Sequence, residues 1–127
     1  MITYRGACHC GNVTFEFESE ITSALHCNCT FCVRRGALLH GVPPEQFRLT
    51  GGATGSIGEV AVYGSGIFQH HFCSNCGIQC FTRRNGQGRF GPQVRVNLRC
   101  VEGIDLEALS VRHFDGAAMP DDSHTWA

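Results

Sequence analysis

The sequence predicts an all-β protein of short antiparallel strands with little helix, tied together by metal ions. Apolar and polar residues alternate in short runs such as Val13–Glu18, and turn-forming residues separate these runs roughly every 8–12 positions. No segment keeps the 3.6-residue period of an amphipathic helix. Seven of the nine cysteines lie in three tight groups, and C-x-C and C-x-x-C spacings are typical of metal ligands.

The first half of the chain predicts five strands and one helical turn. Thr30–Arg35 is expected to form the turn, with Gly36 ending it, and Pro43-Pro44 stops the strand that follows. The five strands are expected at Ile2–Ala7, Val13–Glu18, Ile21–Cys27, Ala37–Val42 and Phe47–Thr50.

The second half predicts five more strands. The glycine-rich stretch Gly51–Gly58 is interpreted as a hairpin loop, because no amphipathic helix follows to complete a phosphate site. Asn85–Pro92 reads as a turn-rich loop, Leu106–Leu109 as a short helix, and the tail through Trp126 as irregular. The strands are expected at Glu59–Tyr63, Ile67–Phe72, Gln79–Arg83, Val94–Cys100 and Ser110–Phe114.

Length and charge narrow the class of protein. At 127 residues, without an internal repeat or linker, residues 1–127 are expected to form a single domain. No apolar run is long enough for a membrane helix, and Met1–Gly6 has no apolar segment of a secretory leader. We therefore expect a cytoplasmic protein. The cytoplasm is a reducing compartment, which disfavours disulfides. All ten cations are arginine, and the net charge of −1 without a basic run argues against nucleic-acid binding.

Two cysteine pairs predict a closed structural zinc site. Cys8 and Cys10 form one pair, Cys73 and Cys76 the other, and a glycine follows each pair. Glycine tolerates the positive φ of the sharp turns that surround a metal, and a tetrahedral structural zinc takes four ligands. Small buried apolar side chains are the alternative interpretation of these cysteines.

The central group Cys27, Cys29 and Cys32 has three thiols and no partner pair. Three protein ligands with an open fourth position are typical of catalytic zinc, so an exchangeable catalytic zinc is the first interpretation. A closed site that recruits a fourth ligand is the second, with Cys80 a credible ligand and Cys100 better explained as core. A redox-active or metal-free cluster is the third.

The histidines near these motifs are interpreted as structural or solvent-facing. His9 lies inside a turn and is expected to face solvent. His26 should point away from the side of Cys27 in an extended strand. His70 and His71 are adjacent, so at most one of them is expected to face inward.

Three segments in order resemble the glutathione-dependent formaldehyde-activating enzymes, also called S-(hydroxymethyl)glutathione synthase-like proteins. They are Gly6–Phe15, Cys27–Arg35 and Phe72–Gly77. The resemblance implies a zinc-stapled β-tent in which the two outer pairs hold the structural zinc and Cys27, Cys29 and Cys32 the catalytic zinc. Cys80 departs from the family pattern. One branch of the family resembles a centromere-associated protein, so the resemblance says more about fold and metal than about substrate.

The resulting hypothesis is a carbon–sulfur lyase that acts on thiol–aldehyde adducts such as S-(hydroxymethyl)glutathione. A soft zinc site would lower the pKa of a bound thiol such as glutathione. Arg34 and Arg35 are candidates for binding the thiol's carboxylates, with a solvated turn as the alternative. A non-catalytic zinc-stapled binding module and a thiol reductase are the rival functions. The sequence leaves the thiol, the electrophile and the oligomeric state open.

Overall fold

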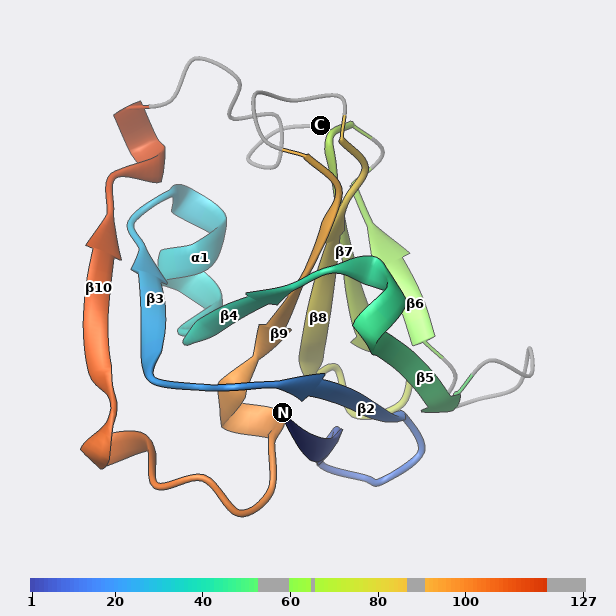
Figure 1. Cartoon of the computed structure of the whole chain (residues 1–127). Helices are drawn as coiled ribbons and strands as arrows, with labels where there is room; N and C mark the ends of the chain where they lie inside the picture. The colour runs from blue at the N-terminus through green and yellow to red at the C-terminus, as the bar shows by residue number, and fades with distance from the viewer. Residues whose placement is uncertain (53–59, 65, 87–90, 119–127) are drawn as a thin grey trace.

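The computed structural model describes residues 1–52, 60–64, 66–86 and 91–118, and within them ten strands form two sheets (Figure 1). The all-β prediction is therefore confirmed. Most of the expected hairpin loop Gly51–Gly58, the middle of Asn85–Pro92 and the end of the tail lie outside the described residues. The smaller sheet is antiparallel, in the order β1-β2-β5, and consists of β1 (Ile2–Ala7), β2 (Thr14–Ser19) and β5 (Phe47–Gly51).

The larger sheet has the order β10-β3-β4-β9-β8-β7-β6. Neighbouring strands in this sheet are antiparallel, except for β3 and β10, which run parallel to each other at the left of Figure 1. This pair departs from the antiparallel prediction. The strands are β3 (Ser23–Cys27), β4 (Leu39–Val42), β6 (Val60–Tyr63), β7 (Phe68–Cys73), β8 (Gln79–Arg84), β9 (Gln93–Asn97) and β10 (Ser110–Phe114).

Within the described residues, helix is confined to short turns. The predicted helical turn is α1 (Thr30–Arg35), and it ends at Gly36, whose φ of 65° is the left-handed conformation that glycine adopts easily. None of the described helices is long and apolar enough to cross a membrane. The 3₁₀ turns are η1 (Pro44–Gln46), η2 (Leu98–Cys100), η3 (Leu106–Ala108) and η4 (Gly116–Ala118).

The main core lies between the two sheets. The alternation in β2 sends Phe15 and Phe17 inward, where both are almost fully buried. Phe15 stacks on Phe47 of β5, with ring centroids 5.6 Å apart, and meets Phe81 of the larger sheet edge-on at 6.2 Å. Burying such a ring contributes roughly 1.5–3 kcal/mol, so these aromatics join the sheets at their centre.

The predicted strand Val94–Cys100 ends three residues early, at Asn97. The Asn97 side chain accepts a hydrogen bond from the Arg99 backbone N–H at 3.1 Å and donates one to the Gln79 carbonyl at 2.9 Å. These two bonds turn the chain into η2, because an asparagine side chain competes with the strand's own backbone pairing. Cys100 therefore ends a 3₁₀ turn rather than a strand.

The expectation that only one of His70 and His71 faces inward is wrong. The larger sheet is covered on both faces, by the smaller sheet on one side and by α1 on the other. His70 stacks on Phe31 of α1 with centroids 3.9 Å apart, and His71 stacks on Phe81 of the main core at 4.7 Å. Successive side chains on a strand point to opposite faces, so a sheet covered on both faces can pack two adjacent histidines, of which His70 is buried and His71 half-buried.

Burial of His71 predicts a loss of stability in mild acid. Both of its ring nitrogens are buried without a hydrogen-bond partner among the described residues, and burial lowers its pKa to about 4. The unfolded chain then binds a proton near pH 6.5 that the folded chain does not, so the free energy of unfolding falls as the pH drops from 6.5 to 4. Allowing for partial solvent exposure, the contribution is about 1–2 kcal/mol.

Denaturant unfolding at pH 7 and pH 5 checks this prediction in the wild type and in His71→Phe. We expect the drop between the two pH values to be smaller in the variant. Metal-binding thiolates contribute equally to both proteins, so the difference between the two drops isolates His71. Equal drops in both proteins would contradict the assignment.

Candidate metal centres

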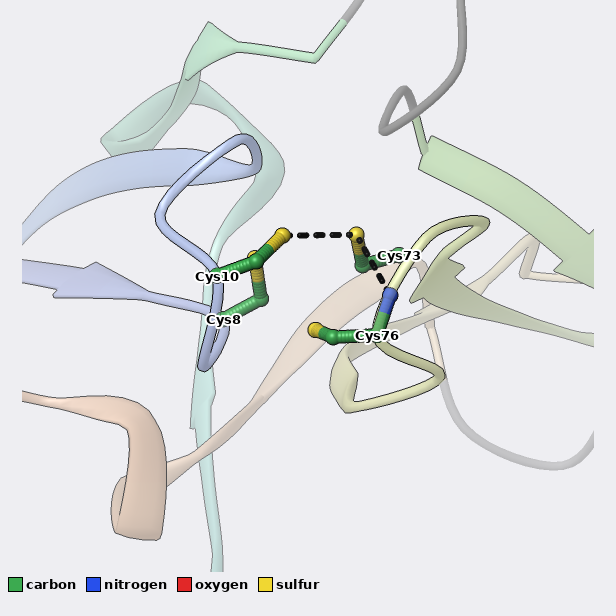
Figure 2. A group of neighbouring side chains, drawn as sticks. All are labelled: Cys8, Cys10, Cys73 and Cys76. Atoms are coloured by element: carbon green, nitrogen blue, oxygen red, sulfur yellow. Dashed lines mark hydrogen bonds between the residues drawn. The ribbon is translucent and has the colours of Figure 1, made fainter.

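The four predicted structural ligands lie together between two hairpin loops. Cys8 and Cys10 follow β1, Cys73 ends β7, and Cys76 lies in the turn before β8; Figure 2 shows their sulfur atoms gathered between the loops. All four Sγ atoms are within 4.8 Å of one another, and the Cys8–Cys10 and Cys10–Cys73 pairs are 3.6 Å apart. Tetrahedral zinc with bonds of about 2.3 Å places its sulfurs roughly 3.8 Å apart. The cluster therefore fits a zinc ion.

Backbone amides point at these sulfurs. The N–H of Val13 donates to Cys8 Sγ at 3.3 Å, and the N–H groups of Asn75 and Cys76 donate to Cys73 Sγ at 3.4 and 3.5 Å. The side chain of Asn75 holds the pKa of Cys10 at about 6. Such donors favour the thiolate form, which is the form that binds metal.

Glycines close both loops, as the sequence predicts. Gly11 and Gly77 have φ values of 82° and 79°, in the left-handed region, and nothing crowds the position of a Cβ at either one. Their role is therefore conformational freedom at the turn rather than space.

Cys27, Cys29 and Cys32 form a second cluster at the junction of β3 and α1. Their three Sγ atoms lie within 4.8 Å of one another, and all three residues are buried. Cys29 is the N-cap of α1, and its sulfur accepts a hydrogen bond from the Cys32 backbone N–H at 3.3 Å. The short helix therefore places Cys29 and Cys32 on adjacent turns facing the end of β3.

Thiolates in this buried cluster are disfavoured unless positive charge lies beside them. Contact with the Cys27 thiol raises the pKa values of Cys29 and Cys32, and burial raises them further. Among the described residues the group comprises these three ligands and no fourth. A soft dication fits this buried three-sulfur set and would leave one coordination position for another molecule.

Cys80 and Cys100, considered as fourth ligands, join neither cluster. Cys80 is fully buried in the core between the sheets, in the same buried cluster as Cys8 and Cys73 rather than in that of the three-thiol group. Cys100 packs against the edge of the same core.

The two arginines after the cluster have different positions. Arg34 is exposed, and its Nη1 donates to the Thr30 carbonyl at 3.2 Å. Arg35 reaches inward: Nη2 donates to Cys32 Sγ at 3.3 Å, and Nη1 donates to Gln79 Oε1 at 2.6 Å and Thr82 Oγ1 at 3.0 Å. Its guanidinium also lies 4.8 Å from the centroid of the Phe31 ring. Arg35 thus links the cluster to β8.

The chain after β10 covers the three-thiol cluster, which the sequence does not predict. The Asn28 backbone N–H donates to the Phe114 carbonyl at 3.2 Å, and the Asn28 side chain bonds Asp115 at 2.9 Å and the Ala117 N–H at 3.0 Å. Gly116 is buried here, and a Cβ at this position would lie 2.4 Å from Cys27 Sγ. Only a glycine allows the backbone to approach the sulfur so closely.

Arg95 and His70 are further site residues that sequence patterns miss. Arg95, on β9, interacts electrostatically with all three cysteines of the cluster, although burial is the main influence and lowers its pKa. His70 is buried against Phe31, and its Nδ1 lies 2.9 Å from Thr82 Oγ1, the same hydroxyl that accepts from Arg35. The only sequence signal for these two residues is strand alternation. It brings Thr82 and Arg95 to one face of the sheet once β8 and β9 pair.

His9, which lies between Cys8 and Cys10, and His26 of β3 join neither cysteine cluster of the described residues. His9 is exposed. His26 lies beside buried Cys27 on β3, and its ring is 5.2 Å from that of His113 on β10.

Comparison with known proteins shows the family to which the chain belongs. The model of the glutathione-dependent formaldehyde-activating enzyme family matches residues 3–110. A crystal structure of a Rhodobacter sphaeroides protein, a structural genomics target, is similar with a TM-score of 0.70 and 29% identity, covering 85% of this chain and 99% of the other. The matched segment includes both cysteine clusters. The chain belongs to the glutathione-dependent formaldehyde-activating enzyme family.

Proposed function

We propose that the protein is a zinc-dependent carbon–sulfur lyase that makes or cleaves thiol–aldehyde adducts such as S-(hydroxymethyl)glutathione. The observation that carries the proposal is the buried three-thiol cluster, whose ligand set leaves a position for a substrate thiol. Family membership supports the same chemistry. Nine cysteines without a disulfide suit a reducing compartment such as the cytoplasm.

In the synthetic direction, the sulfur of the thiol forms a bond to the carbon of formaldehyde. The carbonyl π electrons move to oxygen, which takes up a proton as the thiol loses one, so the product is a hydroxymethyl thioether. Cleavage runs through the same steps in reverse. When bound at Cys27, Cys29 and Cys32, zinc supplies a Lewis acid that favours the substrate's thiolate.

The surrounding residues orient the cluster and its substrate. Arg35 donates to Cys32 Sγ and is itself fixed by Gln79 and Thr82, so we assign it to positioning Cys32 and to offsetting the negative charge of three thiolates. Arg34 has an exposed guanidinium on the same helix and is our candidate for binding a carboxylate of the thiol. Arg35 can share that role through an adjacent cavity that it lines.

Native mass spectrometry of freshly purified protein, with and without glutathione, tests the proposal first. We expect two zinc ions per chain and a glutathione adduct. Nuclear magnetic resonance should then show that the zinc-loaded protein accelerates exchange between glutathione and its hydroxymethyl adduct. One tightly held zinc, no adduct and no acceleration would favour the binding module instead.

A comparison of Arg35→Met with Arg34→Met separates the two arginine roles. Hydrogen bonds to charged groups are worth about 1.5–3 kcal/mol, so losing the Arg35–Cys32 contact should lower kcat/KM about 10- to 100-fold. Arg34→Met should raise KM and leave kcat near the wild-type value. Steady-state exchange kinetics give both constants. An Arg35→Met enzyme with wild-type kinetics would remove Arg35 from the mechanism.

A further inference from the structure

Cys80 and Cys100 form a thiol pair that neither metal cluster uses. Cys80 lies on β8 and is fully buried, whereas Cys100 ends η2 and is partly exposed. Each thiol is the main influence on the other's pKa: Cys100 raises the pKa of Cys80, and Cys80 lowers the pKa of Cys100. They come from segments 20 positions apart, which the β8–β9 pairing and the turn after β9 bring together.

The backbone around the pair fixes both thiols. Asn97 turns the chain into η2 and anchors it by donating to the Gln79 carbonyl at 2.9 Å. Cys100 Sγ points at that same carbonyl at 3.9 Å, while Cys80 Sγ points at the Ile78 carbonyl at 3.6 Å. The two sulfurs therefore lie beside the carbonyl groups of two consecutive residues, Ile78 and Gln79, where β8 begins.

A cavity of about 600 Å³ gives access to one of the two thiols. Cys100 lines it and Cys80 does not. Two guanidinium groups, of Arg35 and Arg99, line the same cavity together with one carboxylate, of Glu102, and the amides of Gln79 and Asn97. This volume is large enough for a small molecule, and the mixed polar lining with two cations suits a peptide-like thiol or disulfide that carries carboxylates.

We propose that Cys80 and Cys100 are a thiol–disulfide exchange pair that reacts with a low-molecular-weight disulfide in this cavity. Cys100, as thiolate, attacks one sulfur of the disulfide; a Cys100–S–S–R bond forms and one R–S⁻ leaves. Cys80, as thiolate, then attacks Cys100 Sγ and releases the second R–S⁻, which leaves a Cys80–Cys100 disulfide. The two protein thiols lose two electrons and two protons, and the small disulfide gains them. The pair is thus a redox modification site that does not depend on the proposed lyase activity.

Peptide mapping of the zinc-loaded protein tests the pair. After incubation with glutathione disulfide, free thiols are alkylated in denaturant and chelator, and the protein is digested with trypsin. Cleavage after arginine leaves Cys100 as the only cysteine in the peptide Cys100–Arg112, and Cys80 in Leu49–Arg83 with Cys73 and Cys76. We expect these two peptides to be disulfide-linked, with fragmentation assigning the bond to Cys80. A fully alkylated Cys100, or a bond to Cys73 or Cys76, would overturn the proposal.

Two serine variants test the order of attack. In Cys80→Ser, glutathione should remain attached to Cys100 as a mixed disulfide, because the second thiol is missing. In Cys100→Ser, the buried Cys80 should stay reduced and be fully alkylated. Zinc content measured on the same samples should match that of untreated protein, which shows that the metal clusters are intact. Equal reaction of Cys80 in the absence of Cys100 would reject the cavity as the route. The wild-type map decides the existence of the pair even if a variant fails to fold.

Discussion

A Cys73→Ser variant is expected to lose metal at the four-thiol cluster and, with it, the folded state. Cys73 ends β7 and is fully buried, and its sulfur accepts two backbone N–H groups while contacting Cys10 from a loop 63 positions away. Structural zinc binding, as in zinc-finger peptides, is worth about 10–16 kcal/mol, whereas the net stability of a domain is about 5–15 kcal/mol. Losing most of the zinc-binding free energy therefore removes the whole net stability of the domain.

Zinc analysis and circular dichroism measure this loss directly. We expect the variant to give the spectrum of an unfolded chain at 25 °C and no cooperative transition on heating. Chelation of the wild-type protein should give the same spectrum. Cys100→Ser is the matched control, since it also removes a thiol but touches neither cluster, and it should melt within a few degrees of the wild type. A folded Cys73→Ser protein that lacks only one zinc would show that this metal does not hold the fold together.

The sequence is most informative where the chemistry is local. The spacing of Cys8 and Cys10, and of Cys73 and Cys76, is itself the geometry of a metal-binding loop, and the structure brings all four sulfurs together. The short helix α1 is equally local, because the candidate ligand Cys29 at its N-cap and Gly36 at its end define it within eight residues. Strand alternation likewise identifies the buried face of β2 without knowledge of its neighbours.

The features that sequence reasoning misses depend on contacts between distant segments. Gly116 lies against Cys27 only because β10 pairs parallel to β3, and parallel pairing leaves no signature in a single strand. The inward path of Arg35 depends on Gln79 and Thr82, which β8 supplies from more than 40 positions away. His70 is buried and the ring nitrogens of His71 are buried, on opposite faces, because both faces of the sheet are covered, which alternation alone cannot reveal.

Cys29→Ser is expected to abolish exchange activity while preserving the fold. Cys29 has two roles that this substitution separates: its sulfur is a candidate metal ligand, and it also caps α1 by accepting the Cys32 N–H at 3.3 Å. Serine is among the preferred N-cap residues, so the helix should still begin at Thr30. A hydroxyl is a poor ligand for a soft site, so the second metal should be lost. We expect at least about a 100-fold fall in kcat/KM, equivalent to about 2.7 kcal/mol.

Cys29→Ala provides the matched comparison, because it removes the ligand and the cap together. Both variants should be equally inactive and contain one zinc per chain, but Cys29→Ala should be less stable than Cys29→Ser by about 1 kcal/mol, the usual cost of a lost cap. If the cluster only holds the fold together, as in a binding module, both variants should instead lose several kcal/mol of stability. Melting temperature and exchange rate measured on the same samples therefore distinguish a catalytic cluster, which loses activity alone, from a second structural one.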